Sequence, residues 1–345
     1  MRDSWRLDLL DRSGNVKQEM PGLTSGSLSW RSDQSVPGSG SITWTRDPGV
    51  AIDWLNDRLR ITHIGALGET PMGVWLLSMP GWQTDGPVTR TTIALSDKTA
   101  LLNSALGQWL TLPKGTVVTA EVAEIVRARG GGATLSTDSA EVLTKSMSWD
   151  PPATWLTVVN DLLAAIAYLP LTADMLGRLI VAPYVEPAQR EPVAVYGGDA
   201  DQLRLKPQWS DTSSLFSLPT GVRLYVSRGS TGKGFVGAAD LPDAHPLSAA
   251  SRGGVPHLVT ESSDATTKAK AAVAAQKRLD ELMQVTRAVT VTHPVDGVQV
   301  GDTVTHGPLG INATVTDRTV TLGTGAVVTD TIQHTSTGGE LPWLT

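Results

Sequence analysis

The residue types best suited to holding a metal ion gather in the run Asp240-Leu-Pro-Asp243-Ala-His245. Carboxylates and imidazoles both ligate divalent cations. Loops use the same residues to form turns and to stay hydrated, so we favour a plain loop and keep a metal site as the alternative. The other histidines have no metal-binding spacing; they are His63, His257, His293, His306 and His334. We therefore expect no bound metal.

Two pairs of acidic residues could in principle perform general acid and base chemistry. They are Asp53 with Asp57, and Asp199 with Asp201. Glycosidases set two carboxylates about 5–9.5 Å apart across the scissile bond. Neighbouring acids are much more common as solvated turns, and we interpret both pairs in that way.

Two glycine-rich runs could approach a phosphate. A P-loop has four residues between its first Gly and its Gly-Lys pair, and Ser or Thr follows the Lys. Here only two residues separate Gly229 from Gly232-Lys233, and Gly234 follows the Lys. Gly38-Ser-Gly40 lacks the third glycine of a dinucleotide fingerprint, because Thr43 occupies that position. The chain has no G-x-S-x-G elbow and no H-E-x-x-H pair. We expect no catalytic residues and no cofactor.

Composition narrows the class of protein further. The chain has 345 residues, no cysteine and a formal net charge of −6, so disulfides, thiolate metal sites and cysteine nucleophiles are excluded. A pI near 5.5 argues against a dedicated nucleic-acid binder. The longest apolar candidate, around Leu162–Leu171, is too short to span a bilayer and is broken by Pro170. We expect a soluble chain of two or three domains without a targeting signal.

Tryptophan is the dominant aromatic residue, with 11 Trp against 2 Phe and 4 Tyr. Exposed Trp rings could form a platform for sugars, as in a carbohydrate-binding module. The alternative is that Trp supplies the large residues of strand cores or subunit interfaces. Five Trp with alternating neighbours on or beside predicted strands favour the second interpretation: Trp5, Trp30, Trp44, Trp54 and Trp75.

The first 110 residues alternate apolar and polar side chains and predict an antiparallel β domain. Asp97 is predicted to cap a short helix running toward Asn103. From 111 the pattern becomes helical: Thr119 is predicted to cap one helix, which Gly130-Gly-Gly132 ends. A second helix is predicted to begin near Asp150-Pro-Pro152. Its expected apolar stripe is Leu156, Val159, Leu162, Leu163 and Ile166.

The remaining chain predicts a strand at Gly221–Ser227, a long loop at 235–263 and a strong helix from about Asp264 to Gln284. The last 60 residues are rich in Thr and again predict strands. The expected stripe of the long helix is Ala269, Ala272, Val273, Gln276, Leu279, Leu282 and Met283. The fold class expected for the whole chain is mainly β with α/β insertions.

Several segments of the sequence resemble the minor tail proteins of long-tailed actinobacterial phages, and the baseplate or tail-tip hub of contractile and siphophage tails. The resemblance runs through most of the chain. Its motifs are Lys114-Gly-Thr-Val-Val, Trp155-Leu-Thr-Val-Val-Asn-Asp-Leu-Leu-Ala-Ala-Ile, Gly177-Arg-Leu-Ile-Val-Ala-Pro-Tyr184, Gly221-Val-Arg-Leu-Tyr-Val-Ser-Arg-Gly229, and Val289-Thr-Val-Thr-His-Pro with Val300-Gly-Asp302.

The resemblance implies a homotrimeric hub in which each chain supplies two related antiparallel β-barrel tube domains. Three chains would then form a pseudo-six-fold ring that adapts a hexameric tail tube to three-fold symmetry. The expected limits are 1–110 for the first tube domain, 111–200 for an α/β outer domain, and 201–234 with 286–335 for the second tube domain. The insertion 235–285 would pack with the outer domain, and 336–345 would form a C-terminal tail.

The hub interpretation predicts a structural virion protein at the tail tip, assembled in the host cytoplasm, and not an enzyme. Its expected partners are two further copies, the tail-tube ring, spike or fibre proteins, and double-stranded DNA in transit. An acidic, Thr-rich lumen would repel phosphates, and ring pairing would protect strand edges. In longer relatives hydrolase or fibre modules follow the hub, and we expect none here because the chain stops at Thr345. A glycan-binding β protein is the alternative, and a hydrolase based on Asp240, Asp243 and His245 is a third hypothesis.

Overall fold

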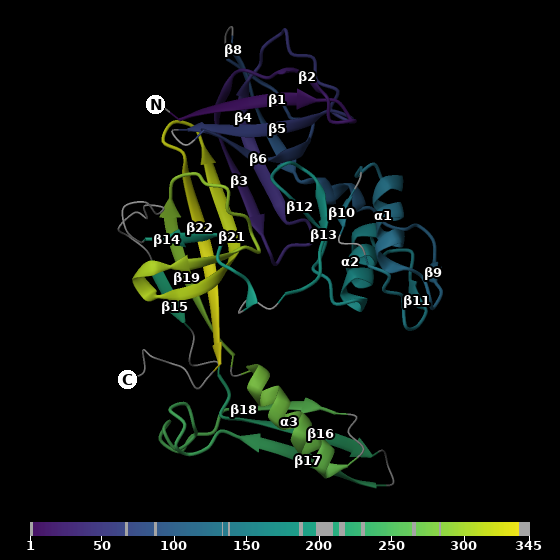
Figure 1. Cartoon of the computed structure of the whole chain (residues 1–345), viewed down its shortest axis with the longest axis vertical. Coiled ribbons are helices and arrows are strands. Elements are labelled where there is room, and N and C mark those ends of the chain that lie inside the picture. Colours follow the sequence, from purple (N-terminus) through teal and green to yellow (C-terminus); the bar gives the residue numbers. More distant parts are fainter. Residues whose placement is uncertain are drawn as a thin grey trace. The chain divides into compact units, whose positions relative to one another are not determined.

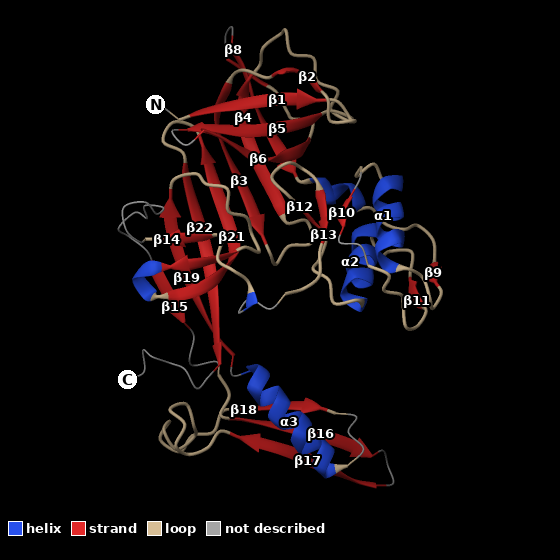
Figure 2. Ribbon diagram, viewed as in Figure 1, coloured by secondary structure: helices blue, strands red, loops and turns tan. Residues whose placement is uncertain are grey.

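The computed structural model describes residues 3–65, 68–85, 88–132, 134–136, 139–185, 189–197, 210–213, 218–228, 232–263, 267–282 and 284–337. The chain forms two compact units. Unit 1 comprises Met1–Trp209 and Val291–Ile332, and unit 2 comprises Ser210–Thr290 and Gln333–Thr345. Strands dominate, with few helices, which confirms the predicted fold class (Figures 1 and 2).

Most of unit 1 is one long sheet in which neighbouring strands mostly run antiparallel, and two of its strands, at 284–293 and 327–337, extend into unit 2. In order across the sheet the strands are β19 (Gln284–His293), β22 (Val327–Thr337), β21 (Ile311–Leu322), β3 (Leu23–Arg31), β4 (Gly38–Thr45), β8 (Val88–Ser96), β6 (Gly68–Leu77), β5 (Arg58–Gly65), β1 (Ser4–Leu10) and β2 (Val16–Glu19). β7 (Gln83–Asp85) pairs with β8. β14 (Ala194–Tyr196) pairs with β20 (Thr303–His306), which pairs with β21 and is followed by a short 3-10 helix at Gly307–Leu309.

The pairing of β21 with β3 joins sequence segments from opposite ends of the chain. Thr321 lies opposite Ser27, and Thr319 lies opposite Ser29. Because side chains alternate between the two faces of a strand, this register fixes which residues enter the core. The sheet is therefore continuous between the N-terminal strands and the C-terminal Thr-rich strands.

Tryptophan fills the core between the curled parts of the sheet. Trp30, Trp44 and Trp75 are buried, and Trp5 and Trp54 pack half-buried against the same cluster. The rings of Trp30 and Trp75 lie 5.3 Å apart and tilted, an arrangement that aromatic pairs prefer. The interpretation of these Trp as core residues is confirmed.

The α/β region of unit 1 has its own apolar core. Its helices are α1 (Val118–Ala128) and α2 (Trp155–Ala165), with a 3-10 helix at Lys98–Leu102. Its strands are β9 (Leu110–Leu112), β10 (Thr134–Ser136), β11 (Met147–Trp149), β12 (Thr172–Ala173) and β13 (Leu179–Val181). All five residues of the stripe predicted for α2 are buried, and Asp97 caps the 3-10 helix as predicted.

Two predicted helix starts are wrong. Thr119 does not cap α1; the helix begins at Val118, and the Thr119 hydroxyl donates to the Ser139 carbonyl. α2 begins at Trp155 and not at Asp150-Pro-Pro152, because the Thr154 hydroxyl accepts the backbone N–H of Thr157. Ser, Thr and Asp near a helix start compete for the capping position, and tertiary contacts decide which one takes it.

Unit 2 contains a three-stranded sheet with α3 (Lys268–Leu282) lying across one face (Figure 1). The strand order is β17 (Gly232–Asp240), β16 (Gly221–Arg228) and β18 (Leu258–Ser262). Separately, β15 (Ser210–Ser213) pairs with Arg287–Thr290 of β19.

Unit 2 confirms one expectation and corrects another. Gly221–Ser227 lies in the strand β16, as predicted, and β16 pairs with β18 of the expected insertion. The expected loop at 235–263 contains most of β17 and all of β18. The expected domain limits stay a prediction.

The buried stripe of α3 also differs from the prediction. Ala271, Ala275 and Leu279 are buried, whereas Val273 is 73% exposed. The reason is a close approach between helix and sheet, since a Cβ added to Gly237 would lie 2.3 Å from the carbonyl carbon of Ala271. Only the side of the helix that carries Ala271 and Ala275 fits against the sheet there, so the larger Val273 faces outward. Asp264 and Met283 lie outside the described residues.

Candidate functional site

The three residues considered for a metal site have structural roles. Asp240 accepts hydrogen bonds from the Arg223 guanidinium at 2.8 and 3.0 Å, and the His245 ring accepts the Leu247 backbone N–H at 3.1 Å. The Asp243 carbonyl accepts the Ser248 hydroxyl. Within the described ranges, no three His, Cys, Asp or Glu residues are grouped so that they could hold an ion.

The carboxylates of Asp53 and Asp57 form a turn and an ion pair. Asp53 accepts from the side chain and backbone of Asn56, which lowers its pKa. Asp57 binds Lys17 at 2.7 Å and accepts the Asp53 backbone N–H. Both carboxylates are therefore engaged by residues of their own turn or by Lys17. Asp199 and Asp201 lie outside the described residues.

The two glycine runs do not form phosphate loops in the described chain. Gly38 and Gly40 lie within β4, where a Cβ on Gly40 would come within 2.9 Å of Leu28. Close strand packing explains this glycine without a ligand. Gly232 and Gly234 belong to β17, and Gly229 lies outside the described residues.

Sequence reasoning missed a buried polar cluster, which we call the Arg318 network. It consists of Tyr196, His293, Asp296, Arg318 and Asp330, from β14, β19, the β19–β20 link, β21 and β22. Asp330 accepts from the Tyr196 hydroxyl at 2.8 Å, the His293 ring at 2.9 Å and the Arg318 guanidinium at 3.2 Å. Arg318 also donates to Asp296.

Burial controls the electrostatics of the Arg318 network. Burial by itself would lower the pKa of Arg318, but the charges of Asp330 and Asp296 outweigh it and raise that pKa. Burial, helped by the charge of Asp330, raises the pKa of Tyr196. Asp330 and Arg318 are each 0% exposed, so no substrate reaches them. The network ties strands together and has no access for chemistry.

One signal in the sequence does mark this network. Asp330 alternates with buried Val328 and Ile332, and Arg318 alternates with buried Val320 and Leu322. A charged residue in phase with core positions needs a buried partner. The pattern indicates that partners exist, but it does not identify them.

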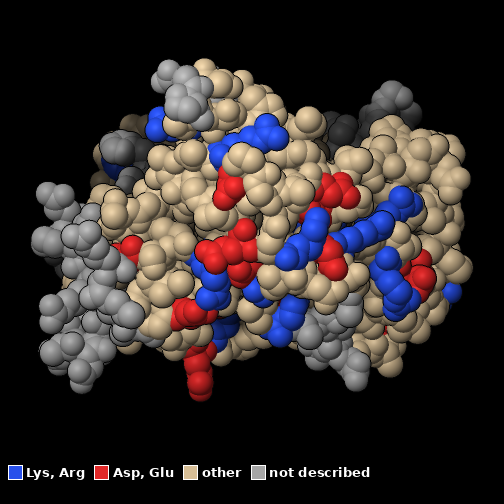
Figure 3. All heavy atoms as spheres, turned by 90° about the horizontal axis from the view of Figure 1, so that it is seen from above, with Lys and Arg blue, Asp and Glu red and all other residues tan. Residues whose placement is uncertain are grey.

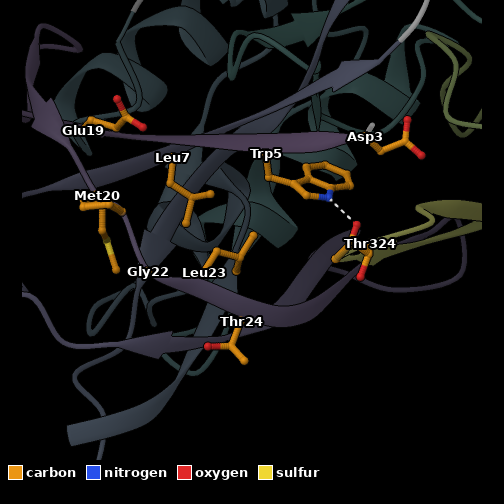
Figure 4. A pocket seen from close by; sticks show the side chains of 11 residues that line it. Asp3, Trp5, Leu7, Glu19, Met20, Gly22, Leu23, Thr24 and Thr324 are labelled. Carbon is orange, nitrogen blue, oxygen red and sulfur yellow. Dashed lines mark hydrogen bonds between the residues drawn. The ribbon is translucent and has the colours of Figure 1, made fainter. Parts of the chain in front are cut away.

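A pocket of about 380 Å³ lies between β1, the link from β2 to β3, and the turn between β21 and β22 (Figure 4). The Trp5 indole donates to the Gly323 carbonyl at 3.1 Å and anchors that turn. Asp3 and Glu19 line the pocket, and Asp3 lies 3.4 Å from His63, whose pKa is lowered by burial. An indole with two carboxylates can contact a cation or a hydroxylated ligand, but the lining holds no nucleophile beside a base.

A second group of Trp rings bears on the glycan alternative. Trp82 lies 6.3 Å from Trp44 and 6.1 Å from Trp54, with interplanar angles of 60° and 75°. The Arg46 guanidinium sits 4.8 Å from the Trp82 ring centre. Because the rings are tilted and one face of Trp82 is occupied, these three residues do not form a flat platform on which a sugar could stack.

Surface charge does not gather by sign on the face shown in Figure 3, where Lys and Arg stand beside Asp and Glu. Ion pairs on β1, β5 and β6 follow the same pattern: Arg6 binds Glu69, and Arg60 binds Asp8, each at 2.7 Å. This face therefore lacks the basic stripe that is typical of nucleic-acid binders. Among the helices in the described part of the chain, none is long and apolar enough to cross a bilayer.

No protein family and no curated protein matches this sequence. Solved structures do match it over nearly its whole length. A 43 kDa tail protein of prophage MuSo2 from Shewanella oneidensis has a TM-score of 0.61 and 14% identity, covering 95% of this chain and 98% of that one. A tail protein from Neisseria meningitidis MC58 has a TM-score of 0.63 and 13% identity, covering 96% and 97%.

The chain has the fold of phage tail proteins. The same fold occurs in an E. coli component of the type VI secretion system that is described as similar to T4 bacteriophage tail proteins. That match has a TM-score of 0.52 and 11% identity, covering 90% of this chain and 73% of that one. At these identities the likeness concerns the fold, and at that level the resemblance to tail hub proteins is confirmed.

Proposed function

We propose that the chain is a structural protein of a phage-type tail, located at the tail tip. The observation that carries this proposal is the likeness to two tail proteins over at least 95% of this chain and at least 97% of theirs. The likeness includes the α/β region and the second unit, and is not limited to one common β motif. A likeness over nearly the whole of both chains favours a matching structural role.

The finer proposal is a homotrimeric hub that continues the tail tube, adapts six-fold to three-fold symmetry and lets double-stranded DNA pass. The long sheet supports it in one respect. β2 ends the strand order and has mostly exposed side chains. An unpaired edge is a liability in a monomer, and pairing around a closed ring removes it. The tail-tube ring and spike or fibre proteins are the further proposed partners, in a virion assembled in the host cytoplasm.

The solution mass of the purified chain, measured by light scattering coupled to size exclusion, tests the hub. We expect a species near 109 kDa, three times the chain mass of 36.4 kDa, with a central hole in electron micrographs. A chain that stays monomeric at micromolar concentration contradicts the self-assembling hub.

We also propose that the protein is not an enzyme. The residues of the hydrolase hypothesis are engaged in an ion pair and a turn. Replacing Asp240, Asp243 and His245 together by asparagine should leave infectivity of the parent phage unchanged. A loss of infectivity in virions that still contain the protein in normal amount would restore the hydrolase hypothesis.

A further inference from the structure

One face of the long sheet carries almost only small hydroxyl side chains. We call it the hydroxyl face; it spans β21, β3, β4 and β8. Its members are exposed or half-buried, and they are Ser27, Ser29, Ser39, Ser41, Thr43, Thr92, Thr319 and Thr321. The opposite face of the same strands carries Leu28, Trp30, Ile42, Trp44, Ile93, Leu95, Val320 and Leu322, all in the core.

Strand register places these hydroxyls in continuous rows. One row runs Thr321, Ser27, Ser41 and Ala94 across the four strands. The next runs Thr319, Ser29, Ser39 and Ser96. Directly opposed residues share a face, and the Thr319 and Ser29 hydroxyls are 3.5 Å apart. The rows make one surface of short side chains, to which strands from both the N-terminal and the C-terminal part of the sequence contribute.

Charge is confined to the margins of this surface. Arg90 stands near the start of β8, and Arg31 pairs with Asp317 at 3.3 Å near the end of β3. Arg318 also belongs to β21, but it points into the core. An ordinary solvent-facing surface carries about 25–35% charged residues of both signs. β1, β5 and β6 follow that rule with the partly exposed side chains of Arg6, Arg60 and Glu69, whereas the rows of the hydroxyl face do not.

This composition is costly for the strands themselves. Ser is a weaker strand former than the β-branched residues, which favour the strand by up to about 1 kcal/mol each. β3 and β4 nevertheless read LTSGSLSWR and GSGSITWT. A requirement other than strand stability therefore keeps this face small and uncharged.

The hydroxyl face does not suit a protein partner, because it offers neither apolar area nor charge to hold one. It suits a polyanion that must move past without being held. Lysines would bind phosphates through counterion release, and carboxylates would repel them. Hydroxyls can exchange hydrogen bonds between phosphate and water at little net gain.

We propose that the hydroxyl face lines the channel of the hub and is the wall along which double-stranded DNA passes. This inference rests on the proposed trimer and adds which surface meets the DNA and how. Passage depends on the absence of charge and bulk. It does not depend on an acidic lumen, which the overall charge of −6 had indicated.

Cysteine labelling locates the face, because the chain has no cysteine of its own. Ser27→Cys is the test variant, and Ser104→Cys, exposed in the α/β region, is the matched control. Both are treated as trimers with a poly(ethylene glycol) maleimide of about half the chain mass. We expect three labels per trimer at position 104 and one at position 27, because one polymer in a channel excludes the next. Both variants should take three small maleimides.

Three labels per trimer at position 27 would overturn the channel assignment while leaving the hub intact. Failure to form any trimer would instead refute the proposed function, and the inference with it. The mass measured before labelling distinguishes these two outcomes.

DNA binding tests the chemistry of the wall. The unaltered trimer should not shift linear DNA in a gel at physiological ionic strength. The combined variant Ser27→Lys, Ser41→Lys, Thr321→Lys should bind linear DNA in a salt-sensitive manner, but not closed circles, which have no end to enter a ring. Lysines at Ser104, Thr144 and Ser146 should bind both forms. Salt-sensitive binding by the unaltered trimer, or equal binding of both forms by the first variant, would overturn the proposal.

Discussion

Replacing Arg318 by methionine should destabilise unit 1 severely. Methionine keeps much of the apolar length of the side chain and removes the guanidinium. Asp330 would lose one of three donors and its only permanent cation in the network, and Asp296 would lose the donor that Arg318 supplies. Both Arg318 and Asp330 are 0% exposed, so water does not replace the lost bonds.

The size of the effect follows from burial. Removing one partner of a buried ion pair costs about 3–5 kcal/mol, because the remaining charge stays desolvated. A domain has a total stability of only about 5–15 kcal/mol, so the variant should stand near the limit of folding.

Urea unfolding of the two proteins, followed by near-ultraviolet circular dichroism, measures this loss. The control is Arg127→Met, which breaks an ion pair with Glu124 in which both side chains are 65% exposed, and it should change the midpoint very little. A midpoint for Arg318→Met equal to that of the control would refute the reasoning. Adding Asp330→Leu and Asp296→Leu to Arg318→Met should recover part of the stability, since no charge then stays buried.

Three further changes test other parts of the structure. Burial raises the pKa of Asp97 in spite of its hydrogen bonds. Its contribution to stability is therefore greatest at low pH and is lost as the pH rises through that pKa. When the urea midpoint is measured over a series of pH values, Asp97→Asn should lack this dependence on the acid side. Gly237→Val should push against Ala271 and cost about 1–3 kcal/mol, seen as faster hydrogen exchange in β16 and β17, whereas Ala238→Val on the exposed face should not. Ser27→Val should raise the urea midpoint, because valine favours a strand by up to about 1 kcal/mol more than serine; a lower midpoint would show that the hydroxyl stabilises the fold.

Local patterns predicted the elements that depend on local physics. Alternation identified the strands that contain Trp30 and Trp44, and helical spacing identified the buried stripe of α2. Each pattern is produced by one element burying one face, so it can be read from neighbouring residues. Asp97 is predictable for the same reason, since a capping residue acts within its own turn.

Long-range pairings were beyond these patterns. The Arg318 network joins residues from 196 to 330, and nothing near Tyr196 indicates that its hydroxyl meets Asp330. The stripe of α3 was wrong because its phase is set by a distant glycine, Gly237, and not by the helix. Ala271 is buried and Val273 is exposed, which inverts the usual order of burial, and the close approach of the sheet explains this inversion.

The two faces of the central strands require opposite kinds of side chain at alternate positions. Leu28 and Trp30 bury large side chains, while Ser27 and Ser29 between them contribute little to strand stability. The stability lost on the hydroxyl face has to be recovered on the core face, where Trp30 and Trp44 bury the largest side chains of these strands. On this argument the buried Trp residues and the exposed serines of these strands have one cause, a sheet whose core face must supply the stability that its hydroxyl face does not. A glycan-binding role explains neither the tryptophans buried in the core nor the serines between them.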